Sequence, residues 1–573
     1  MVYNRFLGYV NVIRFSVTRE RCLEPSNTHT HTHTLRPATA VSLTAAPSRH
    51  GMDEPHSSRQ GLVLGNGPGG GAHMHGLFTD AETGQVTYCL ELTDSCLAVQ
   101  RITFTPSSPE RLDLRDCAGS RAYLGESDRS AYLCAYFYPY RYRWMASSPV
   151  RRRDERRFRL ELNADDDNDD AQANLREAER WARAIRGNSA RCAGHASGVL
   201  FSEGLRSCGV MVLVNPQSGW GQATALYNSH IQRMLTEADI PHTLVITERQ
   251  NHAREMVRNA DLTQWDALVI LSGDGLLFEV VNGLMDRPDW EKAIQTPVGI
   301  LPGGSGNALA ASVHHYTRKP QVWGEDLLVS CGFVLCKGLT SKLDLISVHL
   351  SSGVRLFSFL SIAWGFVADV DIESEQFRLI GPFRFIVGTL VRLASLRTYR
   401  GKLAFLPATD NLETDVSQAQ QTHNNRASNK SSEHNPSEHK RLVDHLLVPL
   451  DQPVPQSWTV VEEQEFVLVV AMFQSYLGED WLVAPSAFTD DGVIHLFYMT
   501  AGISRPTLLR LFRAMQSGTH MECGCPHLVY RRARALRLEP ETRPGIITVD
   551  GEQVEYGPLQ AQAHRGVARL ITG

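Results

Sequence analysis

The chain has 573 residues, a formal net charge of -5 and a hydrophobic fraction of 42%. One hydrophobic core does not organise a chain of this length, so we expect two to four folding units. The lack of a basic excess excludes a protein that relies on bulk attraction to nucleic acid. The cysteines have neither zinc-site nor disulfide-framework spacing, and no apolar run reaches the roughly 20 residues of a membrane span. We therefore expect a cytoplasmic protein, with a nuclear location left open.

The N-terminal residues 1–72 are expected to be a disordered tail. They contain the alternating Thr28–Thr34 stretch and the glycine cluster Gly65–Gly71. Such a composition buries too little apolar surface to form a core.

Residues 73–187 are expected to form a β-rich module that a helix closes. The helix Ala171–Arg186 carries one apolar stripe and Trp181, and Gly187 is expected to end it. Strands followed by a C-terminal helix with a tryptophan resemble a pleckstrin-homology domain. The basic run Arg151–Arg159 would either bind phosphoinositides or form a solvated rim, and both interpretations stay open. The strand-like runs are Gln85–Leu92, Leu97–Phe104 and Ala131–Tyr138.

After a linker at residues 188–207, strand and helix patterns alternate over residues 208–335. This alternation predicts an α/β domain with a parallel, Rossmann-like sheet. The expected strands are Cys208–Val214, Thr243–Ile246, Ala267–Leu271 and Val298–Leu301, and the expected helices are near Ala223–Ala238, Ala253–Arg258 and Phe278–Met285.

Residues 336–573 predict a second, β-rich domain. A polar stretch at residues 409–453 is expected to be a disordered insertion in one of its loops. The strand-like runs are Leu343–His349, Phe357–Ala363, Phe466–Phe473, Gly492–Met499 and Ile546–Val549.

Three glycine-rich turns follow three of the expected strands of the α/β domain: residues 214–221 (VNPQSGWG), 271–275 (LSGDG) and 301–308 (LPGGSGNA). The carboxyl ends of parallel strands meet at one edge of a sheet, so we expect the turns to converge there. Glycine backbone and helix N-termini suit phosphate. Asp274 would repel phosphate, so this carboxylate must either hold a cation or accept a proton. The chain has no P-loop motif.

This set of turns resembles the diacylglycerol-kinase-type catalytic domain, over roughly residues 208–570. SGDGLLFEVVNGLM, LPGGSGNALAAS and IAWGFVADVDIESE are most similar to the sphingosine kinases within that family. The module before the catalytic domain is similar to that of their longer vertebrate isoform. The resemblance implies an enzyme that transfers phosphate from ATP, with Mg²⁺, to a lipid hydroxyl.

The resemblance also implies roles for single residues. Asp274 would be the general base, with Ser272, Gly273 and Gly275 lining the acceptor position. Arg378, Arg384 and Asp550-Gly551-Glu552 would approach the nucleotide from the second domain. The first domain would contribute a larger set of ATP-binding residues: Asn215, Pro216, Gln217, Thr247, Glu248, Arg249, Gln250, Asn251, Glu279, Gly304, Ser305 and Gly306.

A sphingoid base carries an ammonium beside its primary hydroxyl, which ceramide and diacylglycerol lack. In the family, the position of Asp371 holds this amine, and a carboxylate facing an ammonium forms a strong charge-assisted pair. The basic, apolar helix Phe383–Tyr399 would cover the lipid tail, dock on a membrane or bind calmodulin; a core helix with extended arginines is the remaining alternative.

The sequence departs from the family at several positions. Ser218, Trp220 and Gln222 stand where the first turn usually has glycine or basic residues, and Phe278 stands where histidine is common. Our hypothesis is a membrane-visiting sphingoid-base kinase. A ceramide kinase and a catalytically weak lipid-binding scaffold are the alternatives.

Overall fold

The computed structural model describes residues 65–66, 72–104, 108–125, 130–144, 148–160, 170–192, 209–380, 383–408 and 442–573. The expectations of disorder at residues 1–64, 67–71 and 409–441, and of a linker at 193–207, lie outside this part of the chain. None of the helices in the described ranges combines the length and the apolar character that a membrane crossing requires.

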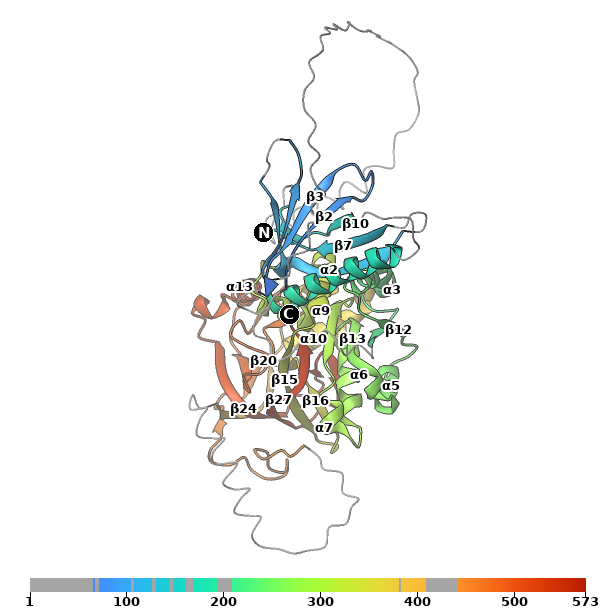
Figure 1. Ribbon diagram of the computed structural model, residues 1–573. Coiled ribbons are helices and arrows are strands. Elements are labelled where there is room, and N and C mark those ends of the chain that lie inside the picture. The colour runs from blue at the N-terminus through green and yellow to red at the C-terminus, as the bar shows by residue number, and fades with distance from the viewer. Residues whose placement is uncertain are drawn as a thin grey trace, which may run out of the picture. The chain divides into compact units, whose positions relative to one another are not determined.

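The N-terminal module (residues 72–192) is an antiparallel sheet that helix α2 closes (Figure 1). Its strand order is β5-β4-β3-β2-β10-β7-β6. Trp181 of α2 packs edge-on against Phe78 of β2, with ring centroids 5.2 Å apart. The elements are β2 Ala72–Asp80, β3 Thr87–Leu92, β4 Cys96–Arg101, β5 Glu110–Asp113, β6 Cys117–Leu124, β7 Ala131–Phe137, β8 Tyr140–Arg141, β9 Val150–Arg151, β10 Asp154–Leu160 and α2 Asp170–Cys192.

Described elements extend past both predicted ends of the module. Residues Gly65–Asn66 form strand β1, which pairs with the start of β2, because backbone pairing needs no apolar side chain. Helix α2 continues through Gly187 to Cys192. Asn188 donates to Thr93 O, and Ser189 donates to Leu114 O and Cys117 O. These contacts with the sheet outweigh the weak helix propensity of one glycine.

The α/β domain (residues 209–337) has four parallel strands in the order β12-β11-β13-β14. The four strands are those predicted, within one or two residues at most ends. They are β11 Gly209–Val214, β12 His242–Ile246, β13 Trp265–Ser272 and β14 Val298–Pro302. The helices are α3 Ala223–Leu226, a π-helical turn Tyr227–Ile231, α4 Gln232–Glu237, α5 His252–Asn259, α6 Asp274–Met285, α7 Trp290–Ala293, α8 Ala308–Tyr316 and α9 Glu325–Lys337.

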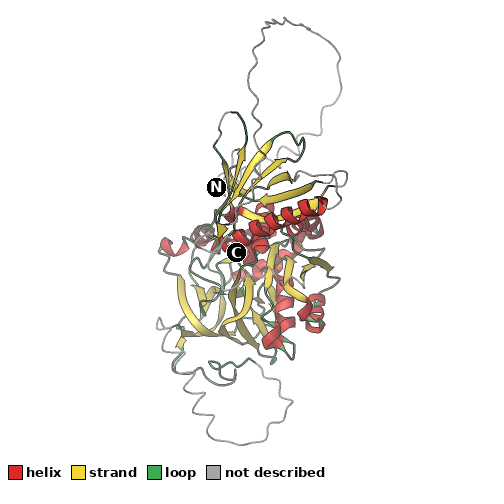
Figure 2. Cartoon of the chain, in the orientation of Figure 1, coloured by secondary structure: helices red, strands yellow, loops and turns green. Residues whose placement is uncertain are grey.

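The β domain (residues 340–571) consists mainly of antiparallel strands (Figure 2). Strand β27 pairs with β14 at Leu570 and Val298, so both domains share one sheet. The main strands are β15 Thr340–Leu350, β16 Arg355–Ser358, β17 Ser361–Gly365, β18 Tyr399–Pro407, β20 Glu465–Met472, β23 Ile494–Thr500, β24 Leu528–Pro540, β25 Ile547–Val549, β26 Glu552–Val554 and β27 Leu559–Ile571. The shorter strands are β19 Thr459–Val460, β21 Tyr476–Gly478 and β22 Trp481–Leu482, and the helices are α10 Phe366–Glu373, η4 Ser374–Ile380, α11 Phe383–Ala394, α13 Arg505–Met515 and η5 His520–Cys523.

Two predictions in the β domain need correction. The predicted helix Phe383–Tyr399 ends at Ala394, and Tyr399 begins β18. The end of the polar insertion is not disordered: residues 442–453 have a defined structure, which Asp444 anchors. This carboxylate accepts hydrogen bonds from His349 and His564 at 2.7 and 2.8 Å. Polar composition alone does not predict disorder where partners distant in sequence satisfy the charge.

Candidate active site

The three glycine-rich turns meet at one edge of the parallel sheet, as predicted. Ser218 Oγ in the first turn accepts a hydrogen bond from Gly273 N at 3.1 Å and one from Ser272 Oγ at 3.0 Å. A Cβ atom on Gly304 of the third turn would lie 2.3 Å from Gly273 Cα. Only glycine fits that approach, because the opposing atom is backbone and cannot rotate away.

Asp274 lies at the centre of this arrangement, as the first residue of α6. Its carboxylate accepts hydrogen bonds from Ala308 N at 2.9 Å and Leu309 N at 3.0 Å, at the start of α8. Burial raises the pKa of Asp274, and these backbone hydrogen bonds oppose the rise. A carboxyl group with a raised pKa is suited to accept a proton from a substrate.

Two further carboxylates come from other elements. A Cβ atom on Gly275, beside Asp274, would lie 2.4 Å from Glu552 Oε1. A Cβ atom on Gly551 would lie 3.4 Å from Asp371 Oδ2. Asp274, Asp371 and Glu552 therefore belong to one acidic site between the α/β domain and the β domain.

The carboxyl group of Asp371 on α10 has a raised pKa. Burial raises its pKa to about 7; Arg384 opposes the rise, and Glu375, Glu552 and Asp274 add to it. Arg384 Nη2 lies 3.5 Å from Asp371, and its Nη1 pairs with Glu375. The guanidinium predicted to contact phosphate is thus held beside Asp371. The side chain of Arg378 lies outside the described residues.

The carboxylate of Asp550 holds a turn of the β domain. Its carboxylate accepts hydrogen bonds from Ser358 Oγ and from the backbone N–H groups of residues 359–361. This turn divides the single strand predicted at Phe357–Ala363 into β16 and β17. Burial raises the pKa of Asp550 to about 6 against these hydrogen bonds. Within Asp550-Gly551-Glu552, Glu552 approaches the site and Asp550 holds the turn.

The loop predicted to surround the nucleotide at Thr247–Asn251 lies against α6. Glu279 accepts hydrogen bonds from Asn251 N at 2.9 Å and Ala253 N at 3.2 Å, where α5 begins. Asn251 has a positive φ of 62°. Arg249 pairs with Glu255 on the exposed side. The structure therefore brings Glu279 and this loop together.

The side chain of Asn307, at the end of the third turn, forms hydrogen bonds within the protein. Its Oδ1 accepts from Gly304 N at 2.9 Å, and its Nδ2 donates to Gly304 O at 3.1 Å and to Glu479 at 2.9 Å. Glu479 also accepts from Gly324 N. Glu479 was not predicted, because no sequence signal near it indicates a partner 172 residues away.

Helix α11 covers an apolar region of the β domain. Phe385 and Leu393 pack against the hydrophobic cluster that includes Phe366 and Phe512. The outer face exposes further apolar residues: Ile386, Leu390 and Val391. Buried Arg384 and Arg392 form ion pairs with carboxylates of α10 and η4, which contradicts extended, solvated arginines at these two positions.

Asp369 differs from Asp371 although both lie on α10. Asp369 is buried, accepts a hydrogen bond from Tyr399 Oη and pairs with Arg392 at 3.6 Å. It therefore stabilises the packing of α10, α11 and β18. Asp371, whose side chain is 26% exposed, is the aspartate available to a ligand.

The residues that depart from the family pattern have distinct surroundings. Trp220 is 56% exposed, whereas Phe278 packs between the two main hydrophobic cores. Ser218 is buried between the first two turns. In the described ranges, His, Cys, Asp and Glu side chains form no group of three or more suited to a metal ion. A carboxylate such as that of Glu552 matches the one or two protein ligands that Mg²⁺ takes when phosphates complete its shell.

Known protein families match both large domains. The diacylglycerol kinase catalytic domain matches residues 209–348, and the YegS C-terminal NAD kinase beta sandwich-like domain matches residues 452–572. The fold and these matches define the class as a kinase of the diacylglycerol-kinase type. A solved putative diacylglycerol kinase of Bacillus anthracis str. Sterne is 17% identical, with a TM-score of 0.42, and covers 65% of this chain and 99% of its own.

Individual relatives narrow the class. Sphingosine kinase 1 of Homo sapiens is 51% identical over 368 residues, which are 64% of this chain and 92% of that relative. Sphingosine kinase 2 of Homo sapiens is 38% identical over 87% of this chain and 91% of its own length. Sphingosine kinase 1 of Arabidopsis thaliana is 33% identical over 63% of this chain and 75% of its own. The chain belongs to the sphingosine kinase family.

Proposed function

We propose that the protein transfers the γ-phosphate of ATP to the primary hydroxyl of a sphingoid base. The observation that carries this proposal is the position of Asp274 where three glycine-rich turns meet, with Asp371 beside it. The hydroxyl oxygen bonds to the γ-phosphorus as the bond to the ADP oxygen breaks, and the hydroxyl proton passes to Asp274. Backbone N–H groups of the turns would bind the phosphates.

The residues of the β domain would select the lipid. Asp371 would pair with the ammonium of the base, and its neighbour Arg384 would hold the carboxylate in place. Phe385 and Leu393 of α11 would cover the apolar chain. A bound Mg²⁺ would neutralise charge on the ATP phosphates. Glu552 would hold it, which leaves the Asp274 carboxylate to accept the hydroxyl proton.

The proposal extends to location and to the N-terminal module. Exposed Ile386, Leu390 and Val391 support transient contact with a membrane from the cytoplasm, and α11 is also our candidate for any calmodulin-type partner. The antiparallel sheet with Trp181 on its closing helix supports a pleckstrin-homology-like class for the module, and the parallel strands support a Rossmann-like class for the α/β domain.

The deciding experiment measures transfer of labelled γ-phosphate from Mg-ATP to sphingosine, ceramide and diacylglycerol in mixed micelles. We expect phosphate on sphingosine alone. Asp274→Asn should lower the rate by about 10²- to 10⁴-fold, which is the usual contribution of a general base. Asp289→Asn, at an exposed aspartate beside α7, is the matched control and should leave the rate unchanged. Transfer to ceramide would contradict the role of Asp371, and no transfer to any lipid would refute the proposal.

A further inference from the structure

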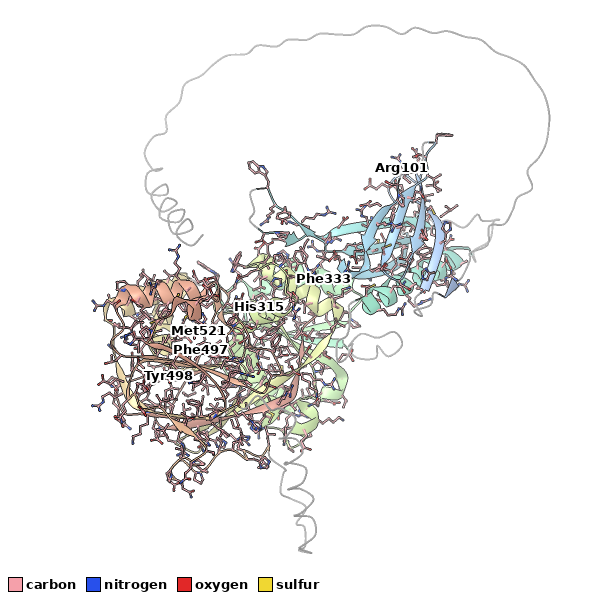
Figure 3. The ribbon with its side chains drawn as sticks, turned by 90° about the vertical axis from the view of Figure 1, so that its left-hand side faces the viewer. Arg101, His315, Phe333, Phe497, Tyr498 and Met521 are labelled. Atoms are coloured by element: carbon pink, nitrogen blue, oxygen red, sulfur yellow. The ribbon has the colours of Figure 1, made fainter. Side chains whose placement is uncertain are left out.

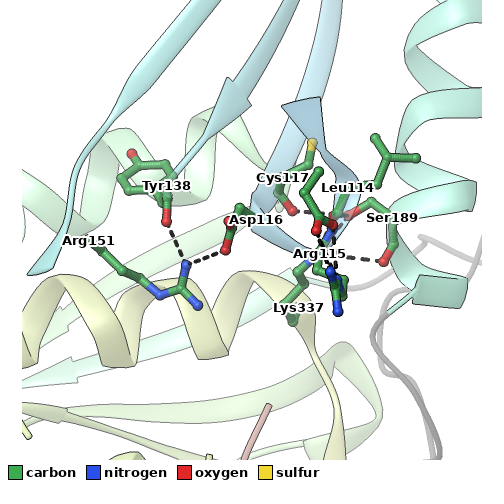
Figure 4. Close-up of polar contacts among 9 residues, drawn as sticks. Leu114, Arg115, Asp116, Cys117, Tyr138, Arg151, Ser189 and Lys337 are labelled. Atoms are coloured by element: carbon green, nitrogen blue, oxygen red, sulfur yellow. Dashed lines mark hydrogen bonds and ion pairs between the residues drawn. The ribbon is translucent and has the colours of Figure 1, made fainter. Parts of the chain in front are cut away.

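A buried lysine joins the α/β domain to the N-terminal module. Lys337, the last residue of α9, donates from Nζ to Leu114 O at 3.1 Å, to Ser189 Oγ at 2.7 Å and to Ser189 O at 3.5 Å (Figure 4). Ser189 lies in the last turn of α2. A cation there is favoured, because the carbonyl groups at a helix C-terminus carry partial negative charge.

An arginine of the module makes the reciprocal contact with α9. The Arg151 guanidinium lies 3.6 Å from the ring centroid of Phe333. It also donates to Tyr138 O and pairs with Asp116 at 3.1 Å. Figure 3 shows Phe333 where α9 meets the module. Arg151 and Lys337 are both buried, so separating the two surfaces would expose them together with the Phe333 ring.

A second contact lies at the end of α4. Glu237 accepts hydrogen bonds from Tyr138 Oη and from Arg153 Nε, each at 2.6 Å, and is only 4% exposed. A Cβ atom on Gly119 of β6 would lie 2.4 Å from Glu237 O and 2.5 Å from Ala238 Cα. The backbone of β6 therefore lies directly on the end of α4, and no larger residue fits at position 119.

These contacts involve the basic run Arg151–Arg159, for which phosphoinositide binding was one of the two interpretations of the sequence. Arg151 and Arg153 face the α/β domain, and Arg156 pairs with Glu110 and Asp154. We propose that the N-terminal module is a permanently docked accessory part of the kinase, which supports helix α9, and not an independently moving lipid-binding domain.

Helix α9, which the module supports, contacts helix α8, and α8 holds the proposed catalytic base. Cys331 of α9 donates from Sγ to Ala310 O of α8 at 3.7 Å. The first N–H groups of α8 hold the Asp274 carboxylate. Gly332 approaches α4 closely, because a Cβ atom there would lie 2.9 Å from Met234 Sδ. The docked module thus restrains α4 and α9 together, and through α8 it restrains Asp274; this last step rests on the proposed function.

Docking is tested without any measurement of activity. A protease site is placed within residues 193–208 of the full chain, the chain is cut there, and the product is analysed by gel filtration. We expect the two pieces to co-elute. Gly119→Val and Glu237→Lys should each separate them, and Arg153→Glu combined with Glu237→Lys should restore association. Arg183→Glu, on the exposed side of α2, is the control and should not separate them. Separation of the unmutated cut protein would overturn the proposal.

The support of α8 is tested by comparing kcat and KM of the cut, associated protein with those of the cut, separated Glu237→Lys variant. A displacement of about 1 Å at a catalytic group costs up to about 100-fold, so we expect kcat to fall about tenfold on separation. Hydrogen exchange of α9 and α8 should increase in parallel. Unchanged kcat and unchanged exchange after separation would refute the support. Inactivity of both forms would instead count against the proposed function, because co-elution is read independently.

Discussion

The pKa of Asp371, raised by burial to about 7, gives the proposed lipid selection a pH dependence. The ammonium of a sphingoid base pairs only with the deprotonated carboxylate. We therefore expect kcat/KM for sphingosine to fall about tenfold for each pH unit below 7 and to level off above it. Asp371→Asn should raise KM for sphingosine and leave only the pH dependence that comes from the proposed base Asp274, whose pKa burial also raises. The measurement is a pH profile of kcat/KM for both proteins, and identical profiles would contradict the role of Asp371.

Ser218 is the residue where departure from the family pattern has a visible structural consequence. Its hydroxyl bridges Ser272 Oγ and Gly273 N, next to Asp274. Ser218→Ala leaves the Gly273 N–H facing a methyl group, which costs about 1–3 kcal/mol when a buried donor loses its partner. Ser218→Gly leaves space for a water molecule to replace the hydroxyl. We expect kcat to fall about tenfold in the alanine variant and less in the glycine variant.

Steady-state kinetics check this order, with Ser229→Ala on the exposed side of the π-helical turn as the control. Equal losses in the alanine and glycine variants would mean that the hydroxyl does not position the second turn. A loss in the control would point to a general effect on folding.

At the scale of elements, the close approach of two turns makes Gly304 sensitive to any side chain. A Cβ atom there would lie 2.3 Å from Gly273 Cα, so one turn must move. We expect Gly304→Ala to weaken ATP binding and to lower kcat by about 100-fold. Gly478→Ala is the matched control, because the nearest atom to its Cβ lies 3.9 Å away. Titration of ATP binding and kinetics distinguish the two, and near-normal ATP binding by Gly304→Ala would contradict this account.

Asp444 anchors the chain where it returns from the polar insertion. Burial alone would raise the pKa of Asp444, but hydrogen bonds from His349, His564 and Ser347 and the charge of Arg355 lower it overall. Its contribution to stability is therefore present above the unfolded-state pKa of about 3.9 and is lost as the pH falls below that value. We expect Asp444→Asn to destabilise the protein by about 3 kcal/mol at pH 7.

Urea unfolding at pH 7 measures this loss. Asp451→Asn, in the same segment, is the comparison. Equal midpoints for wild type and Asp444→Asn would show that the anchor contributes nothing.

The elements that the sequence predicted well are those whose information is local. Buried parallel strands such as β13 are continuous apolar runs, and glycine-rich turns mark where β11, β13 and β14 end. The prediction that Gly187 ends the helix was wrong, because contacts of Asn188 and Ser189 with the sheet extend α2. The contacts of Asp550 were not predictable, because its hydrogen-bond donors, residues 358–361, lie about 190 positions earlier. Motif spacing carries no information about such long-range pairs.

At the scale of the whole molecule, one sheet joins the proposed nucleotide side to the proposed lipid side. Strand β27 pairs with β14 of the α/β domain and with β24 and β15 of the β domain. The turns that surround Asp274 and the elements that carry Asp371 and Glu552 therefore belong to a continuous scaffold. Such a scaffold keeps the three carboxylates close together although their mutual repulsion opposes it. Burial raises the pKa of Asp274 and of Asp371, and the charges of Glu552 and Asp274 add to the rise at Asp371, so these two aspartates affect global stability.

Asp344, which lies outside the acidic site, allows the effect of a raised carboxylate pKa on stability to be measured. Its carboxylate accepts from Gly492 N and Gly566 N at 2.6 Å each, and burial, with Asp491 and Asp490 adding, raises its pKa to about 7. A raised pKa in the folded state contributes stability that is complete below the unfolded-state pKa of about 3.9 and is lost as the pH rises through 7. We expect the urea concentration at the unfolding midpoint to decrease as the pH is raised from 5 to 8.

Asp344→Asn should flatten this slope, because an amide does not titrate in that range. The test compares slopes and not absolute midpoints, because in Asp344→Asn one backbone N–H donor loses its acceptor and lowers the midpoint at every pH. Asp289→Asn should keep the wild-type slope, because Arg287 lowers the pKa of Asp289 still further from the pH range of the measurement. An unchanged slope in Asp344→Asn would assign the pH dependence to Asp371 and Asp550, whose pKa values burial also raises. A wild-type midpoint that rises with pH would contradict the whole account.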